Sequence, residues 1–329
     1  MNVVRQFTHS DTGRPAGQPA VLAIVIPCFN EEDVLGETTR RLTALLEGLE
    51  ANGSVAPESS VWFVDDGSRD GTWPLIARFA AENRYVHGLK LSRNCGHQNA
   101  LLAGLLSVPG EVTISIDADL QDDLGVIEQM LDAHREGSEI VYGVRKSREK
   151  DSFFKKMTAE MYYRILSTMG VDVVFNHADY RLMGRRAIEA LRQFDEVNLF
   201  LRGLIPQLGF ASSCVYYDRG ERFAGVSKYP LRKMLGFAWQ GVTSFSAVPL
   251  RIITSLGWIV SFLSFLFGGW ALMVKIFLNT VLPGWTSTVL PIYFLGGIQL
   301  LCIGIIGEYV AKIYLETKRR PRFLIERSI

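Results

Sequence analysis

The sequence predicts an α/β domain with a mainly parallel sheet, followed by two membrane-spanning helices. Between residues 20 and 150, short apolar runs of strand length alternate with segments of helical periodicity, which is typical of repeated βαβ units. Acidic residues follow several of these runs at the point where each run ends. In the last quarter of the chain, residues 252–274 and 289–307 carry no charge. Each of these stretches is long enough to cross a hydrocarbon core about 30 Å thick.

The composition fits a globular domain joined to a membrane module. The 329 residues include 35 basic and 34 acidic ones, and 48% are hydrophobic. Because the charge is nearly balanced, no net basic field indicates nucleic acid, and we expect none as a partner. Residues 1–19 are polar and lack the apolar region of a secretory signal, which predicts a flexible tail before a cytosolic domain. The four cysteines are widely spaced, which predicts reduced packing residues.

Strands and helices are expected to alternate through the first domain. The first run, Val21–Pro27, is continuously apolar, as in a buried parallel strand, and leucines at helical spacing follow it. Further strands are expected at 60–64, 86–91, 113–116 and 139–144. No G-x-G-x-x-G follows the first run, so a dinucleotide-binding Rossmann enzyme is disfavoured.

Two aspartates end the expected fourth strand. Asp117 and Asp119 lie two residues apart, so on an extended backbone both side chains point the same way while Ala118 turns aside. Ligands gather at the carboxyl ends of strands in open α/β sheets. With the amide oxygen of Gln121, these carboxylates form a set of hard oxygen donors suited to Mg²⁺ or Mn²⁺ and, through the metal, a diphosphate. Taken alone, the motif fits a solvated turn equally well.

The carboxyl-terminal third predicts membrane attachment. Residues 231–251 have the pattern of a cationic amphipathic helix at the membrane surface, with a core helix as the alternative. Two transmembrane helices are expected at 252–274 and 289–311, joined by an extracytoplasmic loop, 275–288. Lysine and arginine are concentrated before the first helix and in the basic tail, 312–329. By the positive-inside bias, both termini are expected to be cytosolic, in an inner (plasma) membrane protein.

Four motifs in this order resemble those of family 2 glycosyltransferases of the polyprenyl-phosphate class. They are Ile24–Glu31 (IVIPCFNE), Val64–Ser68 (VDDGS), Asp117–Gln121 (DADLQ) and Gly225–Tyr229 (GVSKY). Within the class, the chain most resembles bactoprenol (undecaprenyl-phosphate) glucosyltransferases and is similar to dolichol-phosphate mannose synthases. The resemblance runs from about residue 20 to residue 322. It implies that residues 20–230 form a GT-A type nucleotide-sugar-binding domain.

The resemblance also implies roles for residues in the donor half of the site. The nucleotide sugar would be bound by Pro27, Phe29, Glu31, Val64, Asp66, Asp117, Ala118 and Asp119. The metal ligands would be Asp117, Asp119 and Gln121. Phe29 stands where tyrosine is commoner in the family, which removes a hydroxyl contact but keeps a stacking face.

The acceptor half of the site is implied in the same way. Arg145, Arg222 and Lys228 match basic positions that face phosphates, and cations are needed there because both the leaving diphosphate and the incoming lipid phosphate are anionic. Asp179 matches an acidic position beside the acceptor, with Ala178 in place of the family's usual glycine. A phosphate monoester is already ionised near neutral pH. We therefore expect Asp179 to position the acceptor first and to act as a base second.

The predicted reaction transfers a sugar to polyprenyl phosphate at the cytosolic leaflet by in-line displacement with inversion. UDP-glucose is the first choice of donor, with later use of the product in glycan or O-antigen modification. UDP-aminoarabinose derivatives, UDP-N-acetylhexosamines and GDP-mannose are alternative donors. A lipid-linked sugar flippase is the expected functional partner, and homo-oligomers are compatible with the paired glycines at 268–269 and 296–297.

Two other functions predict different sequences. A processive polysaccharide synthase would carry a Q-x-x-R-W stretch before more numerous membrane helices, and the sequence has none. A catalytically dead membrane scaffold would have lost its metal and phosphate residues, whereas Asp117, Asp119, Arg222 and Lys228 are all present.

Overall fold

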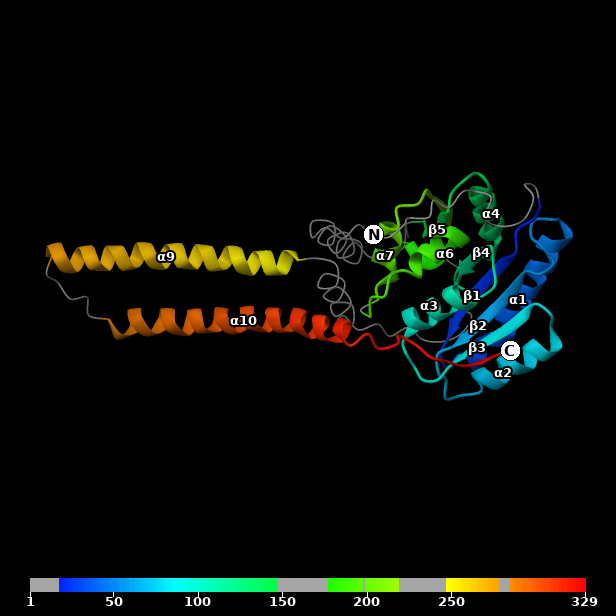
Figure 1. Ribbon diagram of the computed structural model, residues 1–329, viewed down its shortest axis with the longest axis horizontal. Helices are drawn as coiled ribbons and strands as arrows, with labels where there is room; N and C mark the ends of the chain where they lie inside the picture. Colours follow the sequence, from blue (N-terminus) through cyan, green and yellow to red (C-terminus); the bar gives the residue numbers. More distant parts are fainter. Residues whose placement is uncertain (1–17, 147–176, 198, 219–246, 279–283) are drawn as a thin grey trace, which may run out of the picture. The chain divides into compact units, whose positions relative to one another are not determined.

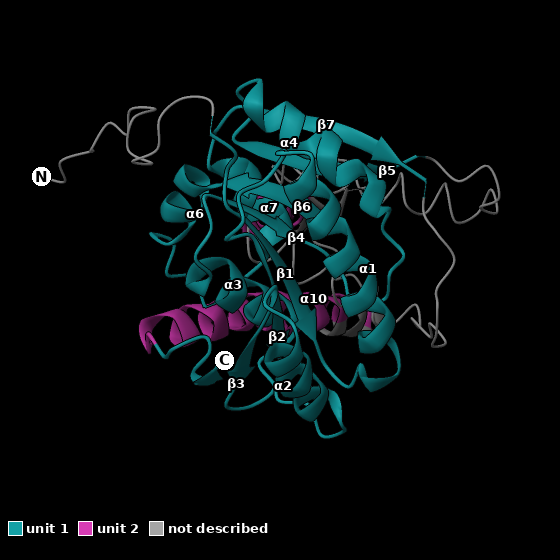
Figure 2. Ribbon diagram, turned by 90° about the vertical axis from the view of Figure 1, so that its right-hand side faces the viewer, with its two compact units in different colours: residues 1–163, 172–229, 320–329 teal, residues 164–171, 230–319 magenta. Residues whose placement is uncertain are grey.

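The computed structural model describes residues 18–146, 177–197, 199–218, 247–278 and 284–329 (Figure 1). The strands are β1 (Leu22–Cys28), β2 (Ser60–Asp65), β3 (Val86–Leu91), β4 (Val112–Ser115), β5 (Ile140–Arg145), β6 (His177–Gly184), β7 (Ser212–Tyr217) and β8 (Ile325–Ser328). The helices are α1 (Glu32–Ala51), α2 (Thr72–Glu82), α3 (His97–Ser107), a 3₁₀ turn η1 (Leu124–Val126), α4 (Ile127–Arg135), α6 (Arg185–Leu191), α7 (Leu201–Gln207), α9 (Val248–Leu278) and α10 (Trp285–Thr317). These elements belong to two compact units, coloured separately in Figure 2.

The first unit is built on a single sheet with the strand order β7-β5-β6-β4-β1-β2-β3-β8. Strand β1 pairs in parallel with β2 and β4, and β2 pairs in parallel with β3. Strand β6 runs antiparallel between β4 and β5, and β7 is parallel to β5. The predicted α/β fold with a mostly parallel sheet is therefore confirmed.

Helices cover both faces of this sheet, and β1 is buried along its whole length. Figure 2 shows α1 on one side of β1, β2 and β4, and α3 with α6 on the other. Ile24 and Ile26 belong to the same core cluster as the leucines of α1. Toward α3, a Cβ at Gly104 would lie 2.3 Å from Val25 Cγ1 and 2.9 Å from Val64 Cγ2. Only glycine lets α3 lie this close to the sheet.

The loops after the parallel strands meet at one edge of the sheet. The Asn30 backbone N–H donates to Ser68 Oγ (3.0 Å), and the Arg69 N–H donates to Asn30 Oδ1 (2.9 Å). Gly67 has a φ of 67°, and a Cβ there would lie 2.7 Å from the backbone nitrogen of Asn94. A residue without a side chain is needed at this point for the loops after β2 and β3 to pack together.

The last strand, β8, lies at the edge of the sheet, antiparallel to β3. The basic tail expected at residues 312–329 contains this strand, which the sequence does not predict. All four residues of β8 are exposed, so its side chains show no apolar alternation by which a strand is recognised. Pairing with the free backbone groups of β3 defines this strand instead.

Helices α9 and α10 belong to the second unit and are strongly apolar. The stretches Val248–Trp270 and Phe294–Thr317 are long and apolar enough to cross a membrane, by length and composition. The predicted spans 252–274 and 289–311 lie inside α9 and α10, which confirms two apolar helices after the α/β domain. Helix α9 begins within the predicted juxtamembrane segment 231–251, most of which lies outside the described residues.

Candidate active site

Asp117 and Asp119 follow β4 directly, at the edge where the loops of the parallel strands meet. Both residues are half-buried, whereas Ala118 between them is buried and its carbonyl accepts a hydrogen bond from Thr38 Oγ1 of α1 (2.9 Å). Leu120 has a φ of 55° and turns the chain away from the extended direction. The two accessible carboxylates are thus separated by a residue fixed to the core.

The Asp117 carboxyl has a strongly raised pKa. Burial raises the pKa of Asp117 to about 6; nearby His97 opposes the rise, and the carboxylates of Asp179, Asp122 and Asp119 add to it. The side chain is nevertheless 34% exposed. A partly accessible carboxylate that is costly to ionise in the protein alone would be stabilised in its charged form by an added cation.

The donor set here fits a divalent cation that takes further ligands from its substrate. Within the described ranges, no group of three or more His, Cys, Asp or Glu residues could hold a metal. Asp117 and Asp119 supply two hard oxygen ligands, and Mg²⁺ and Mn²⁺ are often held by one or two carboxylates together with substrate phosphates and water. The third predicted ligand, Gln121, is buried, and its backbone N–H donates to Asp119 Oδ1 (3.3 Å).

Asp179, on β6, is the centre of a cluster of cationic side chains. Its Oδ1 lies 2.5 Å from Arg181 Nη2, and its Oδ2 lies 3.0 Å from Arg202 Nη2, on α7. His97 Nε2, at the start of α3, lies 3.5 Å from Asp179 Oδ2 and 3.6 Å from Asp117 Oδ1. His97 therefore joins the β4 carboxylates to the Asp179 cluster, and one continuous site contains both.

These contacts set the protonation states of Asp179 and His97. Burial would raise the pKa of Asp179, but the hydrogen bond from His97 and the charges of Arg181 and Arg202 hold it well below its usual value. Burial lowers the pKa of His97, but Asp179 and Asp117 outweigh burial, so its pKa is raised. Asp179 is consequently a weak base near neutral pH, and three basic side chains lie around its carboxylate.

The predicted nucleotide residues occupy different environments. Phe29 follows β1 and is 42% exposed, so its ring is available for stacking. Glu31 is half-buried beside it, and Pro27 is buried. Val64 is fully buried, with its side chain against α3 at Gly104. The Val64 side chain is therefore part of the core rather than of an open surface.

Asp66 is buried and holds the loop that leads into α3. Its Oδ1 accepts the N–H of Cys95 (2.6 Å), and its Oδ2 accepts the N–H of Gly96 (2.9 Å). Burial raises the pKa of Asp66, and these two hydrogen bonds oppose the rise. Since His97 comes next in the chain, Asp66 fixes the backbone from which His97 reaches Asp117 and Asp179.

Arg145, predicted to face phosphate, lies at the end of β5 in an ion pair. Its Nη2 is 3.1 Å from Asp122 Oδ1, and its Nε donates to Tyr217 Oη (3.1 Å). Tyr217 Oη in turn donates to Asp122. The other two predicted phosphate residues, Arg222 and Lys228, lie outside the described residues.

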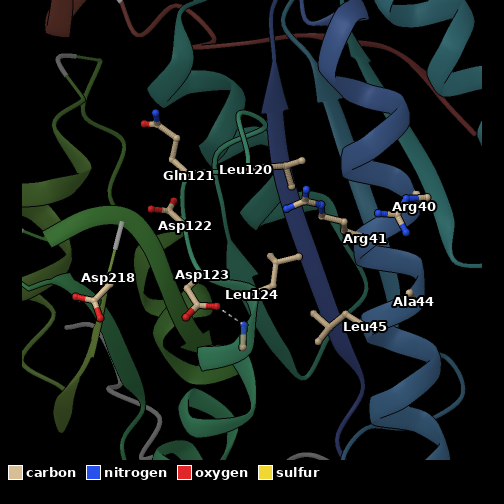
Figure 3. Close-up of a pocket in the computed structure, with 11 residues that line it drawn as sticks. Arg40, Arg41, Ala44, Leu45, Leu120, Gln121, Asp122, Asp123, Leu124 and Asp218 are labelled. Atoms are coloured by element: carbon tan, nitrogen blue, oxygen red, sulfur yellow. Dashed lines mark hydrogen bonds between the residues drawn. The ribbon is translucent and has the colours of Figure 1, made fainter. Parts of the chain in front are cut away.

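A cavity of about 600 Å³ lies between α1 and the loop after β4 (Figure 3). Arg41 and Leu45 line it from α1, and Leu120, Gln121 and Leu124 line it from the loop. Gln121 is thus the one predicted metal ligand that borders this cavity. Neither Asp117 nor Asp119 lines it.

Sequence reasoning missed three residues of the site: His97, Arg181 and Arg202. Of these, His97 could have been predicted, because it lies shortly after β3, at the edge of the sheet where ligands bind. Arg202 lies on α7, far along the chain from its partner. Its role could be recognised only after the fold had brought α7 to β6.

Comparison with known proteins identifies the family. Residues 23–192 match the model of glycosyl transferase family 2. The chain is 51% identical to YkoT, an uncharacterised glycosyltransferase of Bacillus subtilis, over 93% of this chain and 91% of that one. It is 37% identical to the bactoprenol glucosyl transferase of Shigella phage SfX, over 93% and 98% of the two chains. The protein belongs to glycosyl transferase family 2, as the motifs predicted, and is a glycosyltransferase.

Proposed function

We propose that this glycosyltransferase moves a hexose, glucose from UDP-glucose in the first instance, onto polyprenyl phosphate at the cytosolic leaflet. The observation that carries the proposal is the paired character of the site: two accessible carboxylates beside an aspartate surrounded by cations. The carboxylates suit a metal-bound diphosphate, and the cationic surroundings suit a second anionic phosphate. A transferase that joins a nucleotide sugar to a lipid phosphate needs both.

The donor would bind at the carboxyl ends of β1, β2 and β4. Asp117 and Asp119 would hold Mg²⁺ or Mn²⁺, and the exposed ring of Phe29 would stack on the nucleoside base. A bound divalent cation supplies Lewis-acid stabilisation of the charge on the leaving diphosphate. Arg222 and Lys228 are proposed to contact phosphates, as the family resemblance implies. Arg145 would join them if its pairing with Asp122 is exchanged for phosphate.

The acceptor phosphate would bind at the Asp179 cluster. One of its oxygens attacks the anomeric carbon as the bond from that carbon to the diphosphate oxygen breaks, which inverts the configuration. No proton has to be removed from the attacking oxygen near neutral pH, and the low pKa of Asp179 suits a carboxylate that orients Arg202 and His97. This removes the need for Asp179 to serve as a general base.

Helices α9 and α10 would anchor this chemistry to a membrane. Both are long and apolar enough to cross one, and a lipid acceptor confined to the same membrane needs only a search in two dimensions. The amphipathic segment 231–251 is proposed to lie at the membrane surface, with both termini cytosolic. The product would pass to a flippase and then to a downstream glycan.

Transfer of label from donor to lipid tests the proposal. Purified protein is incubated with polyprenyl phosphate, Mn²⁺ and one of a panel of radiolabelled nucleotide sugars, and the organic phase is counted. We expect label from UDP-glucose to enter the organic phase only when polyprenyl phosphate is present. If label enters the organic phase from another nucleotide sugar instead, that sugar replaces glucose in the proposal. No transfer from any donor in the panel would contradict the proposal.

A further inference from the structure

The chain returns to the catalytic unit after α10. Residues 322–329, called here the C-terminal strap, contain β8 and belong to the same compact unit as the active site. The strap contacts two regions of that unit that are far apart in the sequence. Each region leads along the chain to a basic side chain that contacts Asp179.

The first contact is with β3 and the start of the loop after it. The Ile329 N–H donates to Gly88 O (3.0 Å), and the Gly88 N–H donates to Ile329 O (3.0 Å). The Ser92 N–H donates to Leu324 O (2.9 Å). Lys90 Nζ lies 3.1 Å from Glu326. The strap therefore fixes the strand from which the loop to His97 departs.

The second contact is made by Arg322. Its Nη1 donates to the backbone carbonyls of Phe194 (2.8 Å) and Glu196 (3.5 Å). These carbonyls lie between α6 and α7, a few residues before Arg202, which binds Asp179. The start of α7 is also tied to α3, because the Leu201 N–H donates to Gln98 Oε1 (3.0 Å).

We propose that the C-terminal strap is a positioning element for the acceptor half of the active site, with Arg322 as its principal positioning residue. The strap holds the strand before His97 and the loop before Arg202. It thereby fixes the positions of these two side chains relative to Asp179. A small displacement of positioned groups has a large effect on a displacement reaction, since the reacting atoms must be aligned. The catalytic part of this inference rests on the proposed function, whereas the mechanical part does not.

Three full-length variants test the strap. Arg322→Met removes the hydrogen-bond donor but keeps an unbranched side chain of similar length, and Arg322→Lys keeps a hydrogen-bond donor. Arg320→Met removes a nearby exposed arginine and is the control. Hydrogen–deuterium exchange of residues 194–202 reports on the mechanical role. Steady-state kinetics with polyprenyl phosphate and donor varied separately report on the catalytic role.

In Arg322→Met, we expect faster exchange at residues 194–202 and about a tenfold loss of kcat/KM for polyprenyl phosphate, with an unchanged KM for the donor. Arg322→Lys should recover most of this loss, and Arg320→Met should match the wild type. Unchanged hydrogen–deuterium exchange in Arg322→Met would contradict the mechanical role of the strap, whether or not the protein transfers sugar to lipid. Faster exchange with wild-type kinetics would overturn its role in the reaction. Absence of transfer by the wild type would instead contradict the proposed function.

Discussion

Asp117 and Asp179 both contact His97, yet their surroundings shift their pKa values in opposite directions. Asp117 lies among other carboxylates, and burial raises its pKa to about 6. Asp179 is even less exposed, with 11% of its side chain accessible, but His97, Arg181 and Arg202 hold its pKa well below the usual value. Burial raises the pKa of both carboxyls; it prevails at Asp117, whereas at Asp179 His97 and the two arginines outweigh it.

This difference divides the site into two halves with different ligands. The β4 half presents the carboxylates of Asp117 and Asp119 and is suited to a cation. The Asp179 half gathers Arg181, Arg202 and His97 around one carboxylate and is suited to an anion. The His97 side chain lies between the two halves and contacts both Asp117 and Asp179. A reaction that moves a sugar from a metal-bound diphosphate to a phosphate would use both halves at once.

The largest effect is expected in the β4 half. Asp119→Asn replaces an anionic ligand by a neutral one of the same shape, and transfer should fall about a thousandfold, because charge stabilisation of the leaving group is lost. The labelled-lipid assay measures this loss. Asp132→Asn, on the exposed face of α4, is the matched control and should retain full activity. Transfer by Asp119→Asn at the wild-type rate would remove Asp119 from the metal site.

In the Asp179 half, Asp179→Asn should mainly reduce stability. Removing the charge leaves Arg181, which is fully buried, without its counter-ion, and such a loss costs about 3 kcal/mol. The unfolding temperature of the variant should therefore lie about 6–10 °C below that of the wild type near neutral pH.

This stability difference should depend on pH in a definite direction. Because the pKa of Asp179 is lowered in the folded protein, its contribution is present above the unfolded pKa, about 4, and is lost as pH falls through the folded value. The gap between wild type and Asp179→Asn should therefore widen as pH falls through the raised pKa of His97, whose shift depends on Asp179, and narrow only below about 4. A gap that closes between pH 6 and 7 would show that Asp179 has a raised pKa, contrary to this account.

A smaller effect is expected from Arg202→Met. The change removes one of the cations around Asp179 but leaves Arg181 in place, so the KM for polyprenyl phosphate should rise about 10- to 30-fold with little change in the KM for the donor. Varying the two substrates separately measures both constants. Arg185→Met removes a solvent-exposed ion pair with Glu189 and should change neither. An increase confined to the donor KM would place Arg202 in the other half.

The sequence was sufficient to predict strands β1 to β5, but not β6 and β7, and to predict the α/β class, the family and the carboxylates at the end of β4. All of these depend on local periodicity or on residues close together in the chain. The cations around Asp179 were not predicted together, because His97 and Arg202 reach it from α3 and α7. Strand β8 was missed for a related reason: its side chains are exposed, and only the free edge of β3 makes it a strand.

The dependence of transfer on a divalent cation tests the central claim most directly. Purified protein would be given UDP-glucose and polyprenyl phosphate in excess chelator, and Mn²⁺ or Mg²⁺ would then be added back. We expect no transfer in chelator and recovery on addition of the ion in the wild type, with no recovery in Asp119→Asn. Full-rate transfer in excess chelator would contradict the assignment of Asp117 and Asp119 to a metal.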